Sequence, residues 1–494
     1  MTPKSLVQST IILLAVALLG VGIVNAFGFF DLRSYQQTFA PRLPDKYDTS
    51  IRMPTPPPPV RDRSHEGPQF GELQLGPGKP STSFTGSWSR FRGDQFDAIA
   101  KDSPKLARSF PPSGPKILWE IPVGEGYAAA AARNGRAYVL DYDFRRRRDT
   151  LRCLNVETGE EIWNYSYPVM IAKNHGVSRT IPAVTDKFCV TIGPMCHVAC
   201  VDAVSGELLW SRDMVKDYGT IVPQWYAGQC PLIDGREEGA GNFVPGRDRE
   251  TAVLAPSGTE ALMVAIDCAT GDEIWRTPNP FGWVQTHTSV MPMKLGEWDT
   301  YVYVGKEGIV GVCAGTGEIL WTNFDWKIGI ATSPSPLVLP DNRIYVCGSY
   351  EGQGAMIRVT ETASGKYETN LLWRHRFQSE QQTPVFYDGH IFGLRLRSRQ
   401  FVCFDLNGNT VWDSGRGGNF GSPTAGPYMV ADGLFLILSD EGELTIAEAT
   451  AKEFKPLGSW EIWAEAYEAW GPMCFVDGLL ILRDLNRMVC LDLR

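Results

Sequence analysis

The sequence predicts an all-β fold, an eight-bladed β-propeller, and two observations carry this prediction. The first is a recurring motif in which a small hydroxyl residue and a glycine are followed, four positions after the glycine, by a tryptophan. It occurs as LNVETGEEIW, VDAVSGELLW, IDCATGDEIW and VCAGTGEILW, with a shortened FDLNGNTVW. The second is a series of two-residue hairpin turns between alternating apolar runs, at Asn134, Asp388, Asp432 and Asp477. Each hairpin, the third strand after it and the tryptophan-bearing strand give four strands per repeat.

Physical chemistry accounts for each position of the motif. The Asp or Asn that ends the third strand can cap the free amides of the turn, and the glycine supplies the left-handed residue at which the chain reverses. The fixed spacing then delivers a large flat ring to the same place on every fourth strand, where it fills the gap against the neighbouring blade. The predicted docking tryptophans are Trp119, Trp163, Trp210, Trp275, Trp321, Trp373, Trp412 and Trp460.

The two ends of the repeat region predict how the ring closes. The segment KILWEIPV (residues 116–123) is a tryptophan strand with no third strand before it. The C-terminal segment RMVCLDLR is a third strand with no tryptophan strand after it. Pairing the two completes an eighth blade and removes two exposed sheet edges. Seven blades remain the alternative if the unit around Trp460 is not a full blade.

The N-terminal region predicts an exported protein. After a short cytoplasmic segment (residues 1–10), residues 11–30 form an apolar stretch long enough to cross a bilayer as a helix. The alternative is a signal peptide cleaved near Ala26, which would release a secreted protein. An uncleaved inner-membrane anchor is favoured because FGFF prolongs the apolar run, so that the head lies in the periplasm or outside. The proline-rich residues 31–87 predict an extended linker, and residues 88–494 the propeller.

Composition narrows the classes of function. The net charge of −9 argues against a nucleic-acid partner, because phosphate neutralisation requires a basic surface. The local exception is RRRR (Arg145–Arg148), which we interpret as a solvated hairpin tip, with an anion or head-group contact as the alternative. Several of the eleven cysteines occupy equivalent strand positions, so we expect small buried apolar residues rather than disulfides or metal ligands.

Candidate binding residues lie in the segments that precede the innermost strand of each blade, since these segments line the mouth of a propeller's channel. Converging polar and aromatic groups in a concave site are the usual signature of ligand binding. The alternative is that these side chains only satisfy loop backbones and hold ordered water. No catalytic or metal-binding residue is assigned, because no nucleophile elbow or paired-histidine motif is present. The candidates are Tyr127, Arg179, Trp225, Gln229, Gln285, His287, Gln381, Gln382, Asn419, Glu468 and Trp470.

Over residues 88–494 the chain resembles the pyrroloquinoline quinone (PQQ)-type repeat propellers. WSRFRGDQFDAIA (residues 88–100) is similar to the opening of exported PQQ-like propellers of planctomycete-type bacteria. WYAGQCPLIDG (residues 225–235), followed by MVAIDCATGDEIW, is similar to their passage from the third to the fourth blade. The resemblance implies an eight-bladed propeller with docking tryptophans.

The same resemblance implies two classes of function. The outer-membrane assembly propellers imply a non-catalytic interaction or envelope-assembly scaffold, with envelope proteins as partners and no cofactor. The quinoprotein alcohol dehydrogenases imply an oxidoreductase acting on alcohols or polyols, with PQQ and calcium. Those enzymes carry adjacent cysteines that form a disulfide over the cofactor, and this chain has no such pair. The scaffold is therefore favoured, with a small-ligand sensor as a third hypothesis and the oligomeric state left open.

Overall fold

A computed structural model describes residues 71–235, 249–296, 298–327, 333–348, 352–396, 398–415, 420 and 426–494. The chain divides into two units, residues 1–55 and 56–494, and all described residues belong to the second. The predicted cytoplasmic segment, the predicted anchor or signal at residues 11–30 and most of the predicted linker lie outside the described residues. Within the described ranges, no helix has the length and apolar character needed to cross a membrane.

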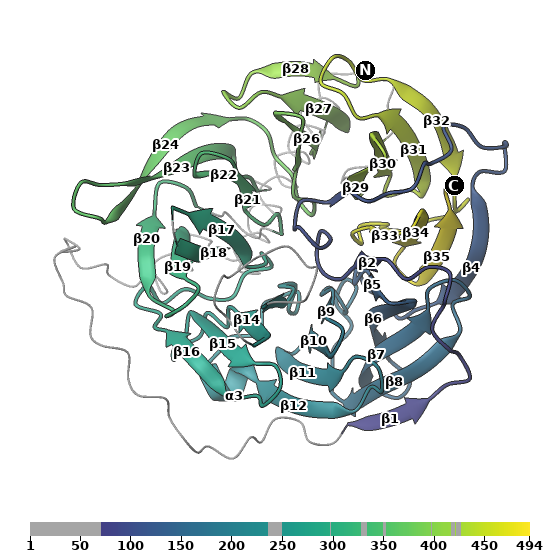
Figure 1. The fold of residues 1–494 in the computed structure, drawn as a ribbon, viewed down its shortest axis with the longest axis horizontal. Helices are drawn as coiled ribbons and strands as arrows, with labels where there is room; N and C mark the ends of the chain where they lie inside the picture. The colour runs from purple at the N-terminus through teal and green to yellow at the C-terminus, as the bar shows by residue number, and fades with distance from the viewer. Residues whose placement is uncertain are drawn as a thin grey trace, which may run out of the picture. The chain divides into compact units, whose positions relative to one another are not determined.

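The described part of the second unit forms eight β-sheets arranged radially as blades (Figure 1). The eight-blade prediction is therefore confirmed, and the unit around Trp460 is a full blade. The strands of each blade are given from the centre outwards. Blades 1 and 2 consist of β5 (Ala131–Arg133), β6 (Arg136–Asp143), β7 (Arg148–Asn155) and β8 (Glu161–Pro168), and of β9 (Ala183–Val184), β10 (Phe188–Ile192), β11 (His197–Asp202) and β12 (Leu208–Asp213), respectively. Blades 3 and 4 consist of β13 (Leu232–Asp234), β14 (Thr251–Leu254), β15 (Met263–Asp267) and β16 (Glu273–Thr277), and of β17 (Met291–Leu295), β18 (Trp298–Val304), β19 (Ile309–Cys313) and β20 (Ile319–Asn323), respectively.

Blades 5 to 8 follow the same plan. Blades 5 and 6 consist of β21 (Leu337–Leu339), β22 (Arg343–Val346), β23 (Gly354–Glu361) and β24 (Tyr367–His375), and of β25 (Val385–Tyr387), β26 (His390–Arg395), β27 (Gln400–Phe404) and β28 (Thr410–Asp413), respectively. Blades 7 and 8 consist of β29 (Tyr428–Ala431), β30 (Leu434–Leu438), β31 (Glu443–Glu448) and β32 (Pro456–Glu461), and of β33 (Cys474–Val476), β34 (Leu479–Arg483), β35 (Arg487–Asp492) and β4 (Lys116–Pro122), respectively. Short elements outside this plan are β1 (Glu72–Leu75), β2 (Ser87–Trp88), β3 (Ile99–Ala100) and helix α3 (Met214–Tyr218).

Blade 8 closes the ring with strands from distant parts of the chain. β4 pairs antiparallel with β35, as predicted, so that neither strand leaves an open edge at the junction. The fully buried Arg483 of β34 adds hydrogen bonds toward blade 1. Its Nη1 donates to the Ala128 carbonyl and its Nη2 to the Gly124 carbonyl, both at 2.9 Å. Closure therefore rests on strand pairing and on one buried cation that joins the two ends.

The repeated turn links each blade to the tryptophan of the preceding blade. In blade 2, Asp202 Oδ1 accepts hydrogen bonds from the backbone amides of Val204 and Ser205. Gly206 has a φ of 79°, and a Cβ added there would lie 2.6 Å from the Trp163 ring of blade 1. Trp163 Nε1 donates to the Val204 carbonyl at 3.0 Å. Glycine is therefore required at this position for two reasons: its φ is positive, and a side chain would collide with the Trp163 ring.

The same docking recurs around the ring. Trp119, Trp210, Trp275 and Trp373 each donate from Nε1 to a backbone carbonyl of the next blade's turn. Trp373 and Trp412 are partly exposed, although Trp412 still packs against Phe392 and Phe454. The remaining predicted docking tryptophans are buried: Trp119, Trp163, Trp210, Trp275, Trp321 and Trp460.

The chain before blade 1 crosses the centre of the ring, a feature that the sequence analysis does not predict. β2 pairs with β5 of blade 1, and β3 pairs in parallel with β29 of blade 7. Residues 89–98 therefore run between the two blades across the middle of the ring (Figure 1), and we call them the crossing segment. The buried Arg92 fixes this segment, because its Nη1 and Nη2 donate to the carbonyls of Thr383 and Pro384 at 2.8 Å. The crossing segment thus obstructs the channel.

Replacing Arg92 is expected to destabilise the ring strongly. Arg92→Ala removes donors from four backbone carbonyls, three of them buried, and leaves a cavity, so we expect a loss of about 3–5 kcal/mol. Arg92→Lys should recover little, because an ammonium cannot reproduce the planar fork of donors. Urea unfolding measures the effect, with the exposed Arg146→Ala as control. A loss below about 1 kcal/mol for Arg92→Ala would show that the crossing segment is not anchored as described.

The end of the predicted linker is docked on blade 1, which corrects the predicted boundary at residue 88. β1 pairs antiparallel with β8 as an additional outer strand. Further along, the Ser81 amide donates to the Gly135 carbonyl at 2.9 Å. The outer edge of β8 offers unpaired backbone groups, and an extended chain satisfies them. Proline content predicts the extended conformation of this segment but does not reveal its partner.

Strand direction gives the ring two faces. In each blade the innermost strand starts on one face of the ring, and the antiparallel second strand ends on that same face. This face therefore carries the inter-blade connections and the turns between second and third strands. We call it the funnel face. The turns between first and second and between third and fourth strands lie on the opposite face. The turn between β6 and β7 lies on the funnel face. It confirms the predicted exposed hairpin tip for Arg145, Arg146 and Arg147, whereas Arg148 is half-buried and begins β7.

Candidate functional site

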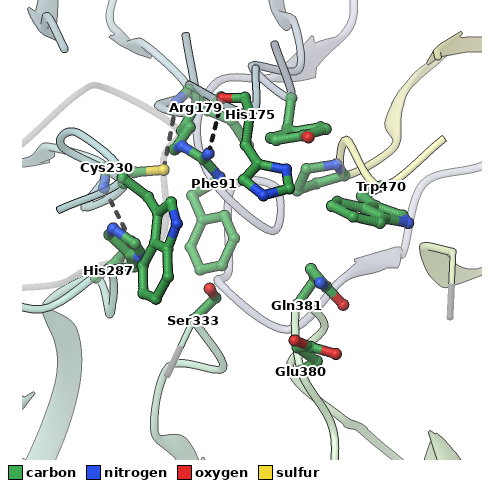
Figure 2. Close-up of a pocket in the computed structure, with 15 residues that line it drawn as sticks. Phe91, His175, Arg179, Cys230, His287, Ser333, Glu380, Gln381 and Trp470 are labelled. Carbon is green, nitrogen blue, oxygen red and sulfur yellow. Dashed lines mark hydrogen bonds between the residues drawn. The ribbon is translucent and has the colours of Figure 1, made fainter. Parts of the chain in front are cut away.

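A cavity opens on the funnel face beside the crossing segment, and we call it the funnel (Figure 2). It encloses about 1120 Å³, including open space at its mouth. Six of the eleven candidates line it: Tyr127, Arg179, Trp225, His287, Gln381 and Trp470. These residues come from six different inter-blade connections, so the ring brings together groups that are far apart in the sequence. The other lining residues are Phe91, His175, Ile181, Gly228, Cys230, Ser289, Ser333, Glu380 and Pro472.

One wall of the funnel is an aromatic pair with a cation beside it. The rings of Tyr127 and Trp470 stack with centroids 5.0 Å apart, and the Arg179 guanidinium lies 4.8 Å from the Tyr127 ring centroid. The Tyr127 hydroxyl donates to Glu468, and burial together with this carboxylate raises the pKa of Tyr127 well above its ordinary value. Gln382 Nε2 donates to the Trp470 carbonyl at 2.8 Å. The wall is therefore held in place by groups behind it.

His287 lies in the funnel as a neutral imidazole. Burial, and then the positive charge of Arg179, lower its pKa to about 4. His287 Nε2 lies 3.0 Å from the Tyr226 carbonyl, which can only accept a hydrogen bond, so Nε2 carries the hydrogen. In the neutral ring the other nitrogen, Nδ1, is then a hydrogen-bond acceptor. His287 offers the funnel an acceptor rather than a charge.

Three polar atoms of the funnel wall have no hydrogen-bond partner among the described residues. They are Arg179 Nε, Gln381 Oε1 and Trp470 Nε1, and all three are shielded from solvent. Arg179 does use Nη2, which donates to the His175 carbonyl at 3.2 Å (Figure 2). An unpaired buried polar group costs about 1–3 kcal/mol, and such groups commonly mark a bound water or a ligand. The wall therefore has hydrogen-bonding capacity that a ligand could use after a small side-chain adjustment.

Three of the predicted glutamine side chains form hydrogen bonds with the protein backbone instead of lining the funnel. Gln229 is buried, with Oε1 accepting from the Ala255 amide at 2.8 Å and Nε2 donating to the Ala255 carbonyl at 3.2 Å. Gln285 is buried as well and contacts the same carbonyl at 3.4 Å. Gln382, as described above, holds Trp470. For these residues the structure favours the alternative that they satisfy loop backbones.

The two remaining candidates are Glu468 and Asn419. Glu468 lies behind the lining, hydrogen-bonded to Tyr127, and has a left-handed φ of 51°. Asn419 lies outside the described residues. Phe91 was not predicted from the sequence, because the crossing segment was not expected in the channel. Glu380 was not predicted either, although it directly precedes the candidate Gln381 and the same rule could have identified it.

The described residues provide no evident metal centre. They contain no group of three His, Cys, Asp or Glu residues placed to hold a metal ion. All eleven cysteines are free and buried, as predicted for small apolar residues. Cys230 lines the funnel, and burial raises its pKa to about 11, so its thiol is neutral near pH 7.

Comparison with known families decides the classification. The family model described as "Outer membrane protein assembly factor BamB" (PQQ_2) matches residues 194–454, more than half of the chain. The chain belongs to the PQQ_2 family. This result confirms the resemblance to PQQ-type propellers that the repeats indicate. No curated protein matched the chain in sequence.

Solved structures with a similar fold include an enzyme and an assembly factor. The quinohemoprotein alcohol dehydrogenase from Comamonas testosteroni is 10% identical, covers 82% of this chain and 80% of its own, and superposes with a TM-score of 0.53. BamB from Moraxella catarrhalis is 15% identical, covers 76% of this chain and 100% of its own, and has a TM-score of 0.47. At these identities the likeness to the dehydrogenase shows the propeller fold alone.

Proposed function

We propose that this PQQ_2-family chain is an exported, non-catalytic binding propeller, a scaffold for envelope assembly that receives a partner or ligand in its funnel. The observation that carries the proposal is the funnel itself, a cavity with an aromatic wall and unpaired polar atoms. The family description, which names an outer-membrane assembly factor, supports a role in assembly. Envelope proteins are therefore the proposed partners.

Three titratable groups of the funnel lining, Tyr127, Cys230 and His287, support binding over acid–base catalysis. An efficient general acid or base has a pKa near the working pH. The pKa of Tyr127 is raised by burial, that of Cys230 is raised to about 11, and that of His287 is lowered to about 4. These three groups therefore do not exchange protons readily near pH 7.

The location of the propeller is a further part of the proposal. Residues 11–30 would hold it at the inner membrane with the propeller in the periplasm or outside, and cleavage near Ala26 would instead release it. Extraction of native membranes with carbonate distinguishes the two, because an anchored chain stays with the membrane and a cleaved chain does not.

The alternative function is a quinoprotein-like oxidoreductase acting on alcohols or polyols, with PQQ and calcium. The described residues do not fit this cofactor. They contain no group of three His, Cys, Asp or Glu residues placed to hold a metal ion, and the funnel cysteine, Cys230, has no adjacent cysteine with which to form a disulfide over a quinone. We therefore propose that the funnel works without PQQ. A small-ligand sensor is the third candidate, and the peptide experiment below separates it from the scaffold.

Supplying the cofactor tests the non-catalytic proposal. With PQQ and calcium added to the purified protein, we expect no dye-linked oxidation of alcohols or polyols above background, and no change in the quinone absorbance spectrum. The control is the same assay on a known quinoprotein. Turnover that His287→Ala or Glu468→Gln abolishes, with the melting temperature retained, would refute the scaffold and establish the oxidoreductase.

A further inference from the structure

A basic strip leads from the tip of blade 1 toward the funnel, in a chain whose net charge is −9. The exposed tip between β6 and β7 carries Arg145, Arg146 and Arg147. Arg147 contacts the connection between blades 1 and 2, since its Nη1 lies 3.6 Å from Met170 Sδ. That connection then supplies Lys173 and Arg179, and Arg179 lines the funnel. The strip therefore joins the outer tip of the funnel face to the cavity.

Carboxylates neutralise only part of this strip. Lys173 Nζ pairs with Glu125 at 2.7 Å, and Arg146 lies 3.8 Å from Asp143. Arg145, Arg147 and Arg179 form no ion pair with any described residue. At the funnel, Glu380 is also in the lining, and Glu468 accepts the hydrogen bond from Tyr127. Three cations of the strip are thus available to an incoming anion.

The polar groups around Arg179 include both donors and acceptors. Arg179 Nε and Trp470 Nε1 are donors, and Gln381 Oε1 is an acceptor, all without a partner among the described residues. The neutral His287 adds an acceptor at Nδ1. A polypeptide C-terminus matches this set, because it presents a carboxylate, carbonyl oxygens and amide hydrogens within a few ångströms. An inorganic phosphate or acetate ion offers no comparable amide donor.

We propose that the funnel binds the C-terminal end of an acidic, extended polypeptide, with the terminal carboxylate at Arg179 and upstream Asp or Glu side chains on Arg145, Arg146 and Arg147. The stacked Tyr127 and Trp470 receive an apolar or aromatic terminal side chain. Guanidinium–carboxylate hydrogen bonds are among the strong, charge-assisted ones. This inference rests on the proposed binding function and names its partner class.

The test uses the full chain and one synthetic probe, fluorescein-GDEDGGF, with either a free C-terminal carboxylate or a C-terminal amide. We expect the acid form to bind about 10-fold more tightly than the amide form, because the amide removes the charge that Arg179 pairs with. Arg179→Gln should weaken the acid form to the level of the amide, and Arg179→Lys should restore part of the difference. An excess of inorganic phosphate should not displace the peptide. Fluorescence anisotropy measures each affinity.

A second variant separates the strip from the cavity. In R145Q/R146Q/R147Q we expect weaker binding and a smaller loss of affinity with added salt, while the difference between acid and amide persists. The matched control is K187Q/K366Q/K452Q, which removes the same charge from exposed turns of the opposite face. We expect this variant to keep the affinity for the acid peptide and the difference between acid and amide. Melting temperatures check that every variant is folded.

Three outcomes would overturn the inference: equal binding of acid and amide, unchanged binding in Arg179→Gln, or no binding of either peptide. Equal binding that Trp470→Ala abolishes would leave the funnel as a binding site and remove only the carboxylate specificity. Displacement by phosphate would identify a small-anion site instead. Failure of the binding proposal itself would appear separately, as PQQ-dependent turnover.

Discussion

Removal of residues 487–494 is expected to abolish cooperative folding of the ring. The deletion takes away β35, which pairs with both β34 and β4, and so opens blade 8. Five apolar side chains of this segment are at most 1% exposed: Met488, Val489, Cys490, Leu491 and Leu493. At about 1.5–3 kcal/mol for each large apolar side chain, their burial is comparable to the whole stability of a typical domain, about 5–15 kcal/mol. Calorimetry of the purified chain measures the transition.

The control for this deletion is removal of Arg494 alone, whose side chain pairs with Asp492 at the surface. We expect that change to cost less than about 1 kcal/mol. If the chain without residues 487–494 melts cooperatively at the same temperature as the intact chain, the ring does not depend on the pairing of β4 with β35.

Trp163→Ala is expected to cost about 3–5 kcal/mol, the range of large-to-small changes in protein cores. The ring is 1% exposed, packs against Gly206 of blade 2 and donates to the Val204 carbonyl. The substitution therefore leaves a cavity between two blades and an unpaired carbonyl. Urea unfolding at constant temperature measures the loss.

Trp298 provides the matched control, because the same residue type is 52% exposed at the start of β18. Trp298→Ala should cost less than about 1 kcal/mol. Equal losses at Trp163 and Trp298 would mean that position in the repeat does not determine docking, which contradicts the role assigned to the motif.

The ring of blades could be predicted because the sequence pattern that defines each blade is local and recurs along the chain. The spacing from Gly206 to the next tryptophan, and the hydrogen bonds from Asp202 to its own turn, both lie within one segment. Ring closure was predictable because each terminal segment lacked a complementary strand. The six funnel residues were predictable because the start of an innermost strand fixes which segment faces the channel.

The remaining features depend on contacts between distant residues. Arg92 bonds to Thr383, 291 positions away, and nothing near Arg92 in the sequence indicates that the chain crosses the channel. Gln229 and Gln381 both stand just before an innermost strand. Gln229 turns to the backbone of Ala255, whereas Gln381 lines the funnel. The two residues have the same type and the same position relative to the strand. Their neighbours in the folded structure therefore decide which side-chain amide can reach a ligand in the funnel.

Hydrogen exchange of the full chain tests most directly whether the funnel is the binding surface. In the presence of the acid peptide, we expect slower amide exchange in residues 175–181, 225–230 and 470–472, which line or flank the funnel. The hairpins of the opposite face, at residues 134–135, 388–389 and 432–433, should exchange at unchanged rates. Protection confined to those hairpins, or no protection with the peptide bound, would contradict a funnel that receives the partner.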